Sequence, residues 1–168
     1  MAAVEQAEFS AELTLADEAA TTALAEVVKS VLRAGDVLLL AGPVGAGKSF
    51  FARALISAML ADHGLVEDIP SPTFTLVQTY QAGDLEIWHS DLYRLTSVDE
   101  VAELGLLDAF ATALCLVEWP DRLGEELPAD ALTLAFAQKK TPGERQVVIS
   151  SPNRRWQPLI DRLKERSA

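Results

Sequence analysis

The sequence predicts a three-layer α/β fold with a mixed sheet. Short apolar runs typical of buried strands alternate with amphipathic helical segments along the 168 residues. Two pairs of strand-like runs are joined by short turns, which indicates hairpins inserted among parallel strands. A glycine-rich loop also lies between one apolar run and the helix that follows it. The length fits one domain, so we expect residues 1–168 to form a single unit.

The first three elements are predicted from alternation, capping and apolar length. Residues 9–15 alternate between apolar and polar side chains, which favours a half-buried first strand. Asp17 can cap a helix that runs to about Arg33 and ends at Gly35. The continuous apolar run Val37–Ala41 is typical of a buried parallel strand.

A second helix is expected directly after the glycine-rich loop, over about Ser49–Asp62. Phe51, Leu55 and Met59 recur at four-residue spacing and predict its buried face. Gly64 follows and indicates the end of the helix.

A β-hairpin and a third helix are predicted next. Thr73–Gln81 and Leu85–Leu92 are strand-like runs joined by a three-residue turn. Ser97 and Glu100 have the spacing of a capping box, so we expect a helix that extends to about Phe110.

The remaining elements complete the predicted sheet and add a last helix. Leu114–Val117 is another buried strand, while Leu132–Ala137 and Val147–Ser150 are predicted as strands on either side of a turn. Asn153 is placed to cap the last helix. The side chains expected to point inward from that helix are Trp156, Leu159, Ile160 and Leu163.

The overall charge argues against direct binding of nucleic acid. Lys and Arg total 14 and Asp and Glu total 25, which gives a formal net charge of −11. Contacts to phosphates need a basic surface, so we expect any role on nucleic acid to run through a partner.

The cysteine count and the apolar runs predict a soluble, cytoplasmic protein. The single cysteine, Cys115, excludes a disulfide framework and is expected to be a small buried side chain. Residues 1–10 lack the apolar core of a signal peptide, and no apolar run reaches the about 20 residues that span a bilayer.

The segment Gly42–Ser49 matches the pattern G-x-x-x-x-G-K-[ST] of phosphate-binding P-loops. Its glycines allow the backbone amides to approach phosphate oxygens at the positive end of the next helix. Lys48 is expected to reach the β- and γ-phosphates from the surface of this nest, and Ser49 to offer its hydroxyl to Mg²⁺. The fold is therefore expected to be P-loop NTPase-like, with ATP and Mg²⁺ as cofactors. The predicted nucleotide-binding residues of the loop are Gly42, Gly45, Ala46, Gly47, Lys48 and Ser49.

Two acidic residues are candidates for the second metal anchor that a P-loop site needs. Glu118 ends the apolar run Leu114–Val117, and Asp91 follows another strand-like run. Burying a carboxylate at the end of a strand costs free energy unless a positive charge lies beside it, and Mg²⁺ would supply that charge. We favour Glu118 as the metal anchor and Asp91 as the residue that orients the attacking water or adds a metal contact. The swapped assignment stays open. Lys48, Asp91 and Glu118 are the candidate catalytic residues.

Three neighbours of these acids have two interpretations each. His89 shares a strand face with Asp91, and a structural histidine is the favoured interpretation over a site residue. Trp119 either packs over the nucleotide or belongs to the core. Thr73 either senses the γ-phosphate, as switch threonines do, or reflects only the β-propensity of its strand.

Three further strings, read together with the P-loop, resemble one family. They are Ser71–Val77, His89–Leu95 and Leu116–Pro120, and in this order they resemble the bacterial TsaE family. The resemblance covers about Asp17–Asp121.

The resemblance implies a P-loop ATPase of tRNA threonylcarbamoyladenosine biosynthesis. Such a protein acts with a partner complex of two other proteins that transfers a threonylcarbamoyl group to adenosine in the anticodon loop of tRNAs. It also implies that Ser49 and Glu118 bind Mg²⁺ and that Asp91 is needed for activity. The stretch after about Arg122 matches no string of the family.

Two other classes of protein share the P-loop. A small-molecule kinase has this size but needs a lid with arginines over the transferred phosphate. A GTP-binding switch needs an Asn-Lys-x-Asp string, which this sequence lacks. We interpret the C-terminal basic cluster as a solvated helix face and not as a lid. Its members are Arg154, Arg155, Arg162, Lys164 and Arg166.

Overall fold

A computed structural model of the chain describes residues 9–167 as seven strands in one sheet with helices around it. The strands are β1 (Phe9–Leu15), β2 (Val37–Ala41), β3 (Val77–Ala82), β4 (Leu85–Asp91), β5 (Leu114–Glu118), β6 (Leu132–Gln138) and β7 (Arg145–Ser151). The helices are α1 (Glu18–Lys29), α2 (Lys48–Ala61), α3 (Val98–Glu103), α4 (Leu106–Ala109) and α5 (Gln157–Ser167), with 3₁₀ segments η1 (Pro120–Glu126) and η2 (Arg154–Trp156). Among the described residues, no helix is both long and apolar enough to cross a membrane.

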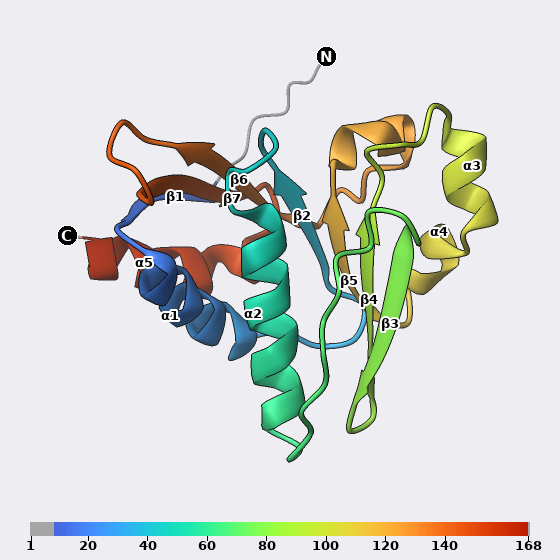
Figure 1. Cartoon of the computed structure of the whole chain (residues 1–168), viewed down its shortest axis with the longest axis horizontal. Helices are drawn as coiled ribbons and strands as arrows, with labels where there is room; N and C mark the ends of the chain where they lie inside the picture. Colours follow the sequence, from blue (N-terminus) through green and yellow to red (C-terminus); the bar gives the residue numbers. More distant parts are fainter. Residues whose placement is uncertain (1–8, 168) are drawn as a thin grey trace.

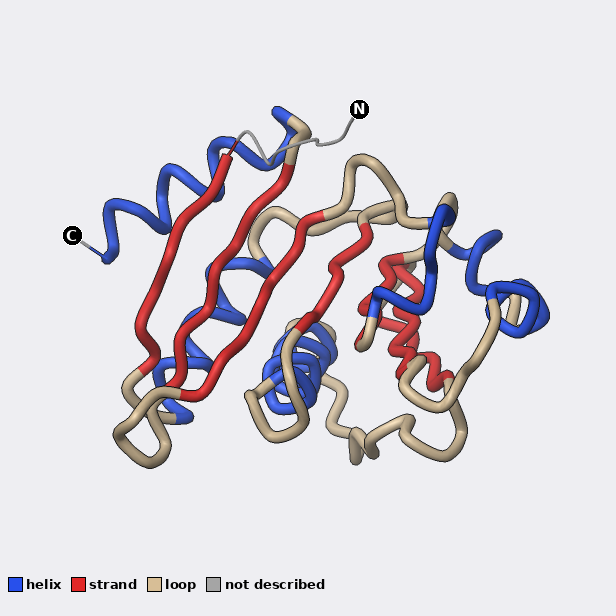
Figure 2. The backbone as a smooth tube through the Cα atoms, turned by 90° about the horizontal axis from the view of Figure 1, so that it is seen from above, coloured by secondary structure: helices blue, strands red, loops and turns tan. Residues whose placement is uncertain are grey.

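The sheet is mixed, as the sequence predicts, and its order is β1-β7-β6-β2-β5-β4-β3. The central strand β2 pairs in parallel with β5 and with β6, and β4 pairs in parallel with β5. The antiparallel pairs β1–β7, β6–β7 and β3–β4 lie toward the two edges. Figure 2 shows the strands side by side with helices around them. This order places the carboxyl end of β2 between those of β5 and β6.

The sheet is covered on both faces, which makes the predicted three layers. One apolar cluster joins α1, α2 and α5 to one face of the strands, with Phe51, Leu55 and Trp156 among its fully buried side chains. The second cluster joins α3, α4 and η1 to the other face around Cys115 and Val117. Figure 1 shows α1, α2 and α5 away from α3 and α4. The alternation of side chains along β5 supplies both clusters.

The first helix begins where predicted and ends earlier. Asp17 accepts a hydrogen bond from the N–H of Ala20 at 2.9 Å, which confirms the cap. The helix ends at Lys29 and not near Arg33, and the hydroxyl of Ser30 donates to the carbonyl of Val27 at 2.7 Å at this end. Gly35, at φ 91°, makes the turn into β2.

The predicted strand over Thr73–Gln81 is wrong in its first half. Residues up to Leu76 form turns, in which the N–H of Leu76 donates to the carbonyl of Pro72 at 2.7 Å. Leu76 has a φ of 71°, which no strand residue adopts, so β3 begins at Val77. Thr73 therefore lies in a loop, and β-propensity does not explain its presence.

The predicted helix to Phe110 is two short helices. The capping box of Ser97 and Glu100 is present and starts α3. Gly105 then adopts a φ of 82° and interrupts the helix before α4. The 3₁₀ segment η1 was not predicted either, because it follows Trp119, whose backbone is left-handed at φ 59°.

The C-terminal segment folds as predicted, with one correction. Asn153 caps η2, and Trp156, Leu159, Ile160 and Leu163 are all buried. Arg155 does not belong to a solvated face, because it forms an ion pair with Asp36 at 2.6 Å and donates to the carbonyl of Val31 at 2.7 Å. This contact ties the C-terminal segment to the turn between α1 and β2.

Arg155→Met is expected to lower the free energy of unfolding by about 2 kcal/mol, because it leaves the largely buried carboxylate of Asp36 without its charged partner. Arg154→Met is the control, since Arg154 is exposed, and surface changes usually cost less than about 0.5 kcal/mol. Urea unfolding of both variants measures the difference. Equal stability of the two would show that the ion pair contributes nothing.

Cys115 is fully buried in β5, and burial raises the pKa of its thiol to about 12. Because the thiolate is the reactive form, we expect no reaction with a disulfide reagent at pH 8 in the folded protein and full reaction in urea. Ala111→Cys, at a neighbouring exposed position, is the control and is expected to add one fast-reacting thiol. Rapid reaction of Cys115 in the folded wild-type protein would contradict its burial.

Candidate functional site

The glycine-rich loop connects the end of β2 to the start of α2 and turns tightly against β6. Gly42 has a φ of 132°, and a Cβ built there would lie 2.4 Å from the carbonyl oxygen of Phe136. Gly47 caps α2 with a φ of 116°. A side chain would clash with β6 at Gly42 and would be strained by the positive φ at Gly47. The loop amides at the amino end of α2 have the arrangement of a nest that binds phosphate groups.

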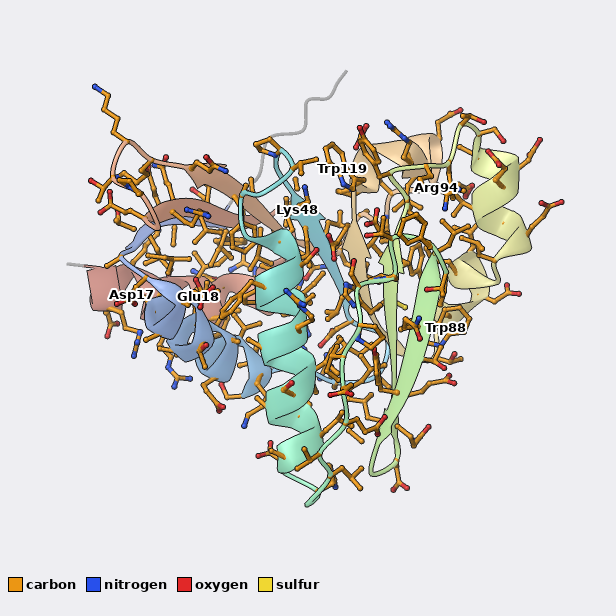
Figure 3. The ribbon with its side chains drawn as sticks, in the orientation of Figure 1. Asp17, Glu18, Lys48, Trp88, Arg94 and Trp119 are labelled. Atoms are coloured by element: carbon orange, nitrogen blue, oxygen red, sulfur yellow. The ribbon has the colours of Figure 1, made fainter. Side chains whose placement is uncertain are left out.

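Lys48 does not project from the surface, which corrects the sequence prediction. Its side chain is 4% exposed and donates to the carbonyls of Gly42 and Pro43. Its Nζ also lies 3.9 Å from the centre of the Trp119 ring, and Figure 3 shows the two side chains together above α2. Burial lowers the pKa of Lys48, and the nearby carboxylates of Glu118 and Asp91 partly oppose this effect.

The two candidate acids lie side by side at the carboxyl ends of parallel strands. Asp91 of β4 is in register with Glu118 of β5, and the side chains are 6% and 2% exposed. The hydroxyl of Ser49 donates to Glu118 Oε1 at 2.8 Å. The hydroxyl of Thr73 lies 3.4 Å from Asp91 Oδ2, while the N–H of Tyr93 donates to Asp91 Oδ1 at 3.0 Å. The site thus joins the P-loop helix, both acids and the loop that holds Thr73.

His89, for which the sequence favoured a structural role, contacts Glu118 of this site. It is fully buried, and its Nε2 lies 2.7 Å from Glu118 Oε2. The sequence did indicate that His89 lies near the acids, because His89 shares a strand face with Asp91. The sequence did not show that β4 and β5 are neighbours, which is what brings His89 to Glu118.

Trp119 is half-buried beside the P-loop. Its ring packs against that of Tyr93 with centroids 4.7 Å apart, and against Lys48 on another side. Both interpretations left open describe part of its position, because Trp119 lines the cavity beside the P-loop and also packs against the second apolar cluster. Tyr93 was not singled out from the sequence.

A cavity of about 530 Å³ runs along the loop and the acids. The predicted residues that line it are Gly45, Gly47, Lys48, Ser49, Thr73, Asp91, Glu118 and Trp119. Gly42 and Ala46 do not line it, and the N–H of Ala46 donates to the carbonyl of Pro43 at 3.2 Å. Glu18 and Arg145 line the cavity from α1 and β7 and were not predicted, because no motif marks them.

The side chains gathered here fit a divalent cation that also touches phosphate. Two buried carboxylates and a hydroxyl are the oxygen ligands that Mg²⁺ prefers. The ammonium group of Lys48 donates to loop carbonyls and not to the acids, so it does not occupy the carboxylate oxygens that a cation would bind. Within residues 9–167 no three His, Cys, Asp or Glu side chains form a metal cage, and Mg²⁺ usually takes its remaining ligands from phosphate and water.

Comparison with known proteins decides the family. The family model described as "Threonylcarbamoyl adenosine biosynthesis protein TsaE" matches residues 15–147. The chain belongs to the TsaE family. Its place in this family supports a role in tRNA threonylcarbamoyladenosine modification.

Two relatives and one solved structure illustrate the similarity. The Bacillus subtilis protein named tRNA threonylcarbamoyladenosine biosynthesis protein TsaE is 33% identical over 144 residues, 85% of this chain and 87% of that protein. The protein of the same name from Rickettsia conorii is 43% identical over 108 residues, 64% of this chain and 60% of its own length. The crystal structure of Bacillus subtilis YdiB matches with a TM-score of 0.73 and 24% identity, covering 98% of this chain and 99% of that one. This likeness shows that the fold is of the same kind.

Gly42→Ala is expected to destabilise the protein more than Gly64→Ala. Both positions have a positive φ, which costs about 1–2 kcal/mol for alanine. Only Gly42 faces a backbone carbonyl, which adds about 1–3 kcal/mol of overpacking. Nothing lies within 4 Å of the Gly64 position. Urea unfolding compares the two, and equal losses would contradict the close approach of the loop to β6.

Proposed function

We propose that this protein binds ATP with Mg²⁺ and hydrolyses it as an accessory factor for threonylcarbamoyl transfer to tRNA. The observation that carries the proposal is the convergence of Ser49, Glu118 and Asp91 in front of the P-loop. Membership of the TsaE family supports the pathway. We further propose that residues 1–168 act as one nucleotide-binding domain.

Each residue of the site has a role that its position supports. The loop amides and Lys48 would bind the phosphates, for which Lys48 must exchange its loop carbonyls for phosphate oxygens. Ser49 and Glu118 would hold Mg²⁺, which neutralises negative charge on the phosphate oxygens when bound. Asp91 would orient the attacking water or add a metal contact. Thr73 and Trp119 would close the cavity over the nucleotide.

The partner is proposed from the family and the charge. The net charge of −11 does not favour binding to the phosphates of tRNA. We therefore propose that tRNA is reached through the threonylcarbamoyl-transferase complex of two other proteins. The nucleotide would change the surface that the partner binds through the loop Ser71–Leu76, because Thr73 of this loop contacts Asp91 at the site.

Glu118→Ala and Asp91→Asn are expected to lower ATP hydrolysis by different routes. Loss of Glu118 removes an oxygen ligand, so the Mg²⁺ concentration for half-maximal activity should rise about 10-fold or more. Loss of the Asp91 charge should lower kcat about 100-fold with little change in KM, as expected for a group that positions water. Mg²⁺ titrations of both variants separate the two effects. The opposite pattern would show that the two acids have exchanged roles.

Binding to the transferase proteins is expected to depend on the nucleotide. The Ser71–Leu76 loop should order differently with and without the γ-phosphate, which changes the surface that a partner meets. The two transferase proteins are titrated into this protein in a calorimeter. The protein is saturated with an ATP analogue, saturated with ADP, or free of nucleotide, and the three affinities are compared. Equal affinity in all three states would exclude the switch, and tight binding of tRNA by this protein alone would exclude the indirect route.

A further inference from the structure

A buried histidine contacts the proposed metal-binding carboxylate from the side opposite Ser49. Glu118 Oε1 accepts a hydrogen bond from the Ser49 hydroxyl at 2.8 Å, and Oε2 lies 2.7 Å from His89 Nε2. His89 is 0% exposed and Glu118 is 2% exposed. The carboxylate therefore has a fixed partner on each oxygen, one from α2 and one from β4.

The direction of the His89 contact follows from its second ring nitrogen. Nδ1 is buried and has no hydrogen-bond partner among the residues that the structure describes. A proton on Nδ1 would be a buried donor without an acceptor, which is costly. The hydrogen-bond pattern therefore assigns the ring proton to Nε2, so that Nε2–H donates to the carboxylate of Glu118.

We infer that His89 is a positioning residue, which holds the Glu118 carboxylate in the orientation that receives Mg²⁺ beside Ser49. The inference rests on the proposed Mg²⁺-dependent nucleotide binding and adds a residue to it. A metal-ligating carboxylate is often oriented by a hydrogen-bond donor behind it, and loss of such a donor typically weakens metal binding by about 10- to 100-fold. The donor lies within strand β4 and not in a loop.

Three substitutions separate the hydrogen bond from packing. His89→Gln keeps an amide N–H about as far from the backbone as Nε2. His89→Leu is apolar and has no donor, and His89→Asn, which is as long as leucine, is polar but too short to reach Glu118. Mg²⁺ is titrated into each protein with a non-hydrolysable ATP analogue, and binding of the analogue is measured by calorimetry, with thermal unfolding as a check on the fold.

We expect His89→Leu and His89→Asn to raise the Mg²⁺ midpoint about 10- to 100-fold, while His89→Gln stays close to wild type. Affinity for the analogue in EDTA should be the same in all four proteins. In a Glu118→Ala background, His89→Leu should cause no further shift, because its partner is gone. If His89→Leu does not fold, the comparison of His89→Asn with His89→Gln decides.

Three outcomes would overturn the inference. They are a wild-type midpoint in His89→Leu and His89→Asn, an equal shift in His89→Gln, or a His89→Leu effect that persists in the Glu118→Ala background. The wild-type arm tests the proposed function separately. If wild-type binding of the analogue did not depend on Mg²⁺, the proposed function itself would be wrong. That result would be obtained without any change at His89, so it is distinguishable from a failure of the inference.

Discussion

The hydrogen bond between Ser49 and Glu118 is the constraint on which the site depends. It joins the first turn of α2 to the last residue of β5, through two side chains that are 69 residues apart in sequence. It is possible because β5 lies beside β2 in parallel, so the P-loop and the acid meet at one edge of the sheet. Asp91 reaches the same place because β4 is parallel to β5. The strand order therefore determines the chemistry at this edge.

The site holds charges that stability alone does not favour. Lys48, Asp91 and Glu118 are all less than a tenth exposed. Lys48 donates to loop carbonyls, so its charge is not directly paired with either acid. Burial of carboxylates with neutral donors is costly unless a cation completes the group. We interpret this cost as the reason why the site would bind phosphate together with Mg²⁺. The phosphate would pair with Lys48, and the Mg²⁺ would pair with both acids.

The sequence predicted the fold, and most of the residues that it singled out as site candidates line the cavity. The cap at Asp17, the strand over Val37–Ala41 and the P-loop needed only neighbouring residues to be recognised. The errors arose where tertiary contacts override local preference. The turn at Leu76 has a positive φ that no motif marks, and Arg155 pairs with Asp36 across 119 residues. The contact of His89 with Glu118 likewise needs the order of the strands, which the sequence does not state.

The most direct test of the account is the unfolding temperature of wild type and Glu118→Gln, with an ATP analogue, in the absence and presence of Mg²⁺. The substitution removes the charge of the carboxylate and keeps its shape. Mg²⁺ is expected to raise the unfolding temperature of the wild-type complex, because a ligand that binds only the folded state stabilises it. At the same Mg²⁺ concentration the increase should be clearly smaller for Glu118→Gln, which binds the metal more weakly. An equal increase in both proteins, or none in wild type, would contradict the claim that Glu118 holds the metal.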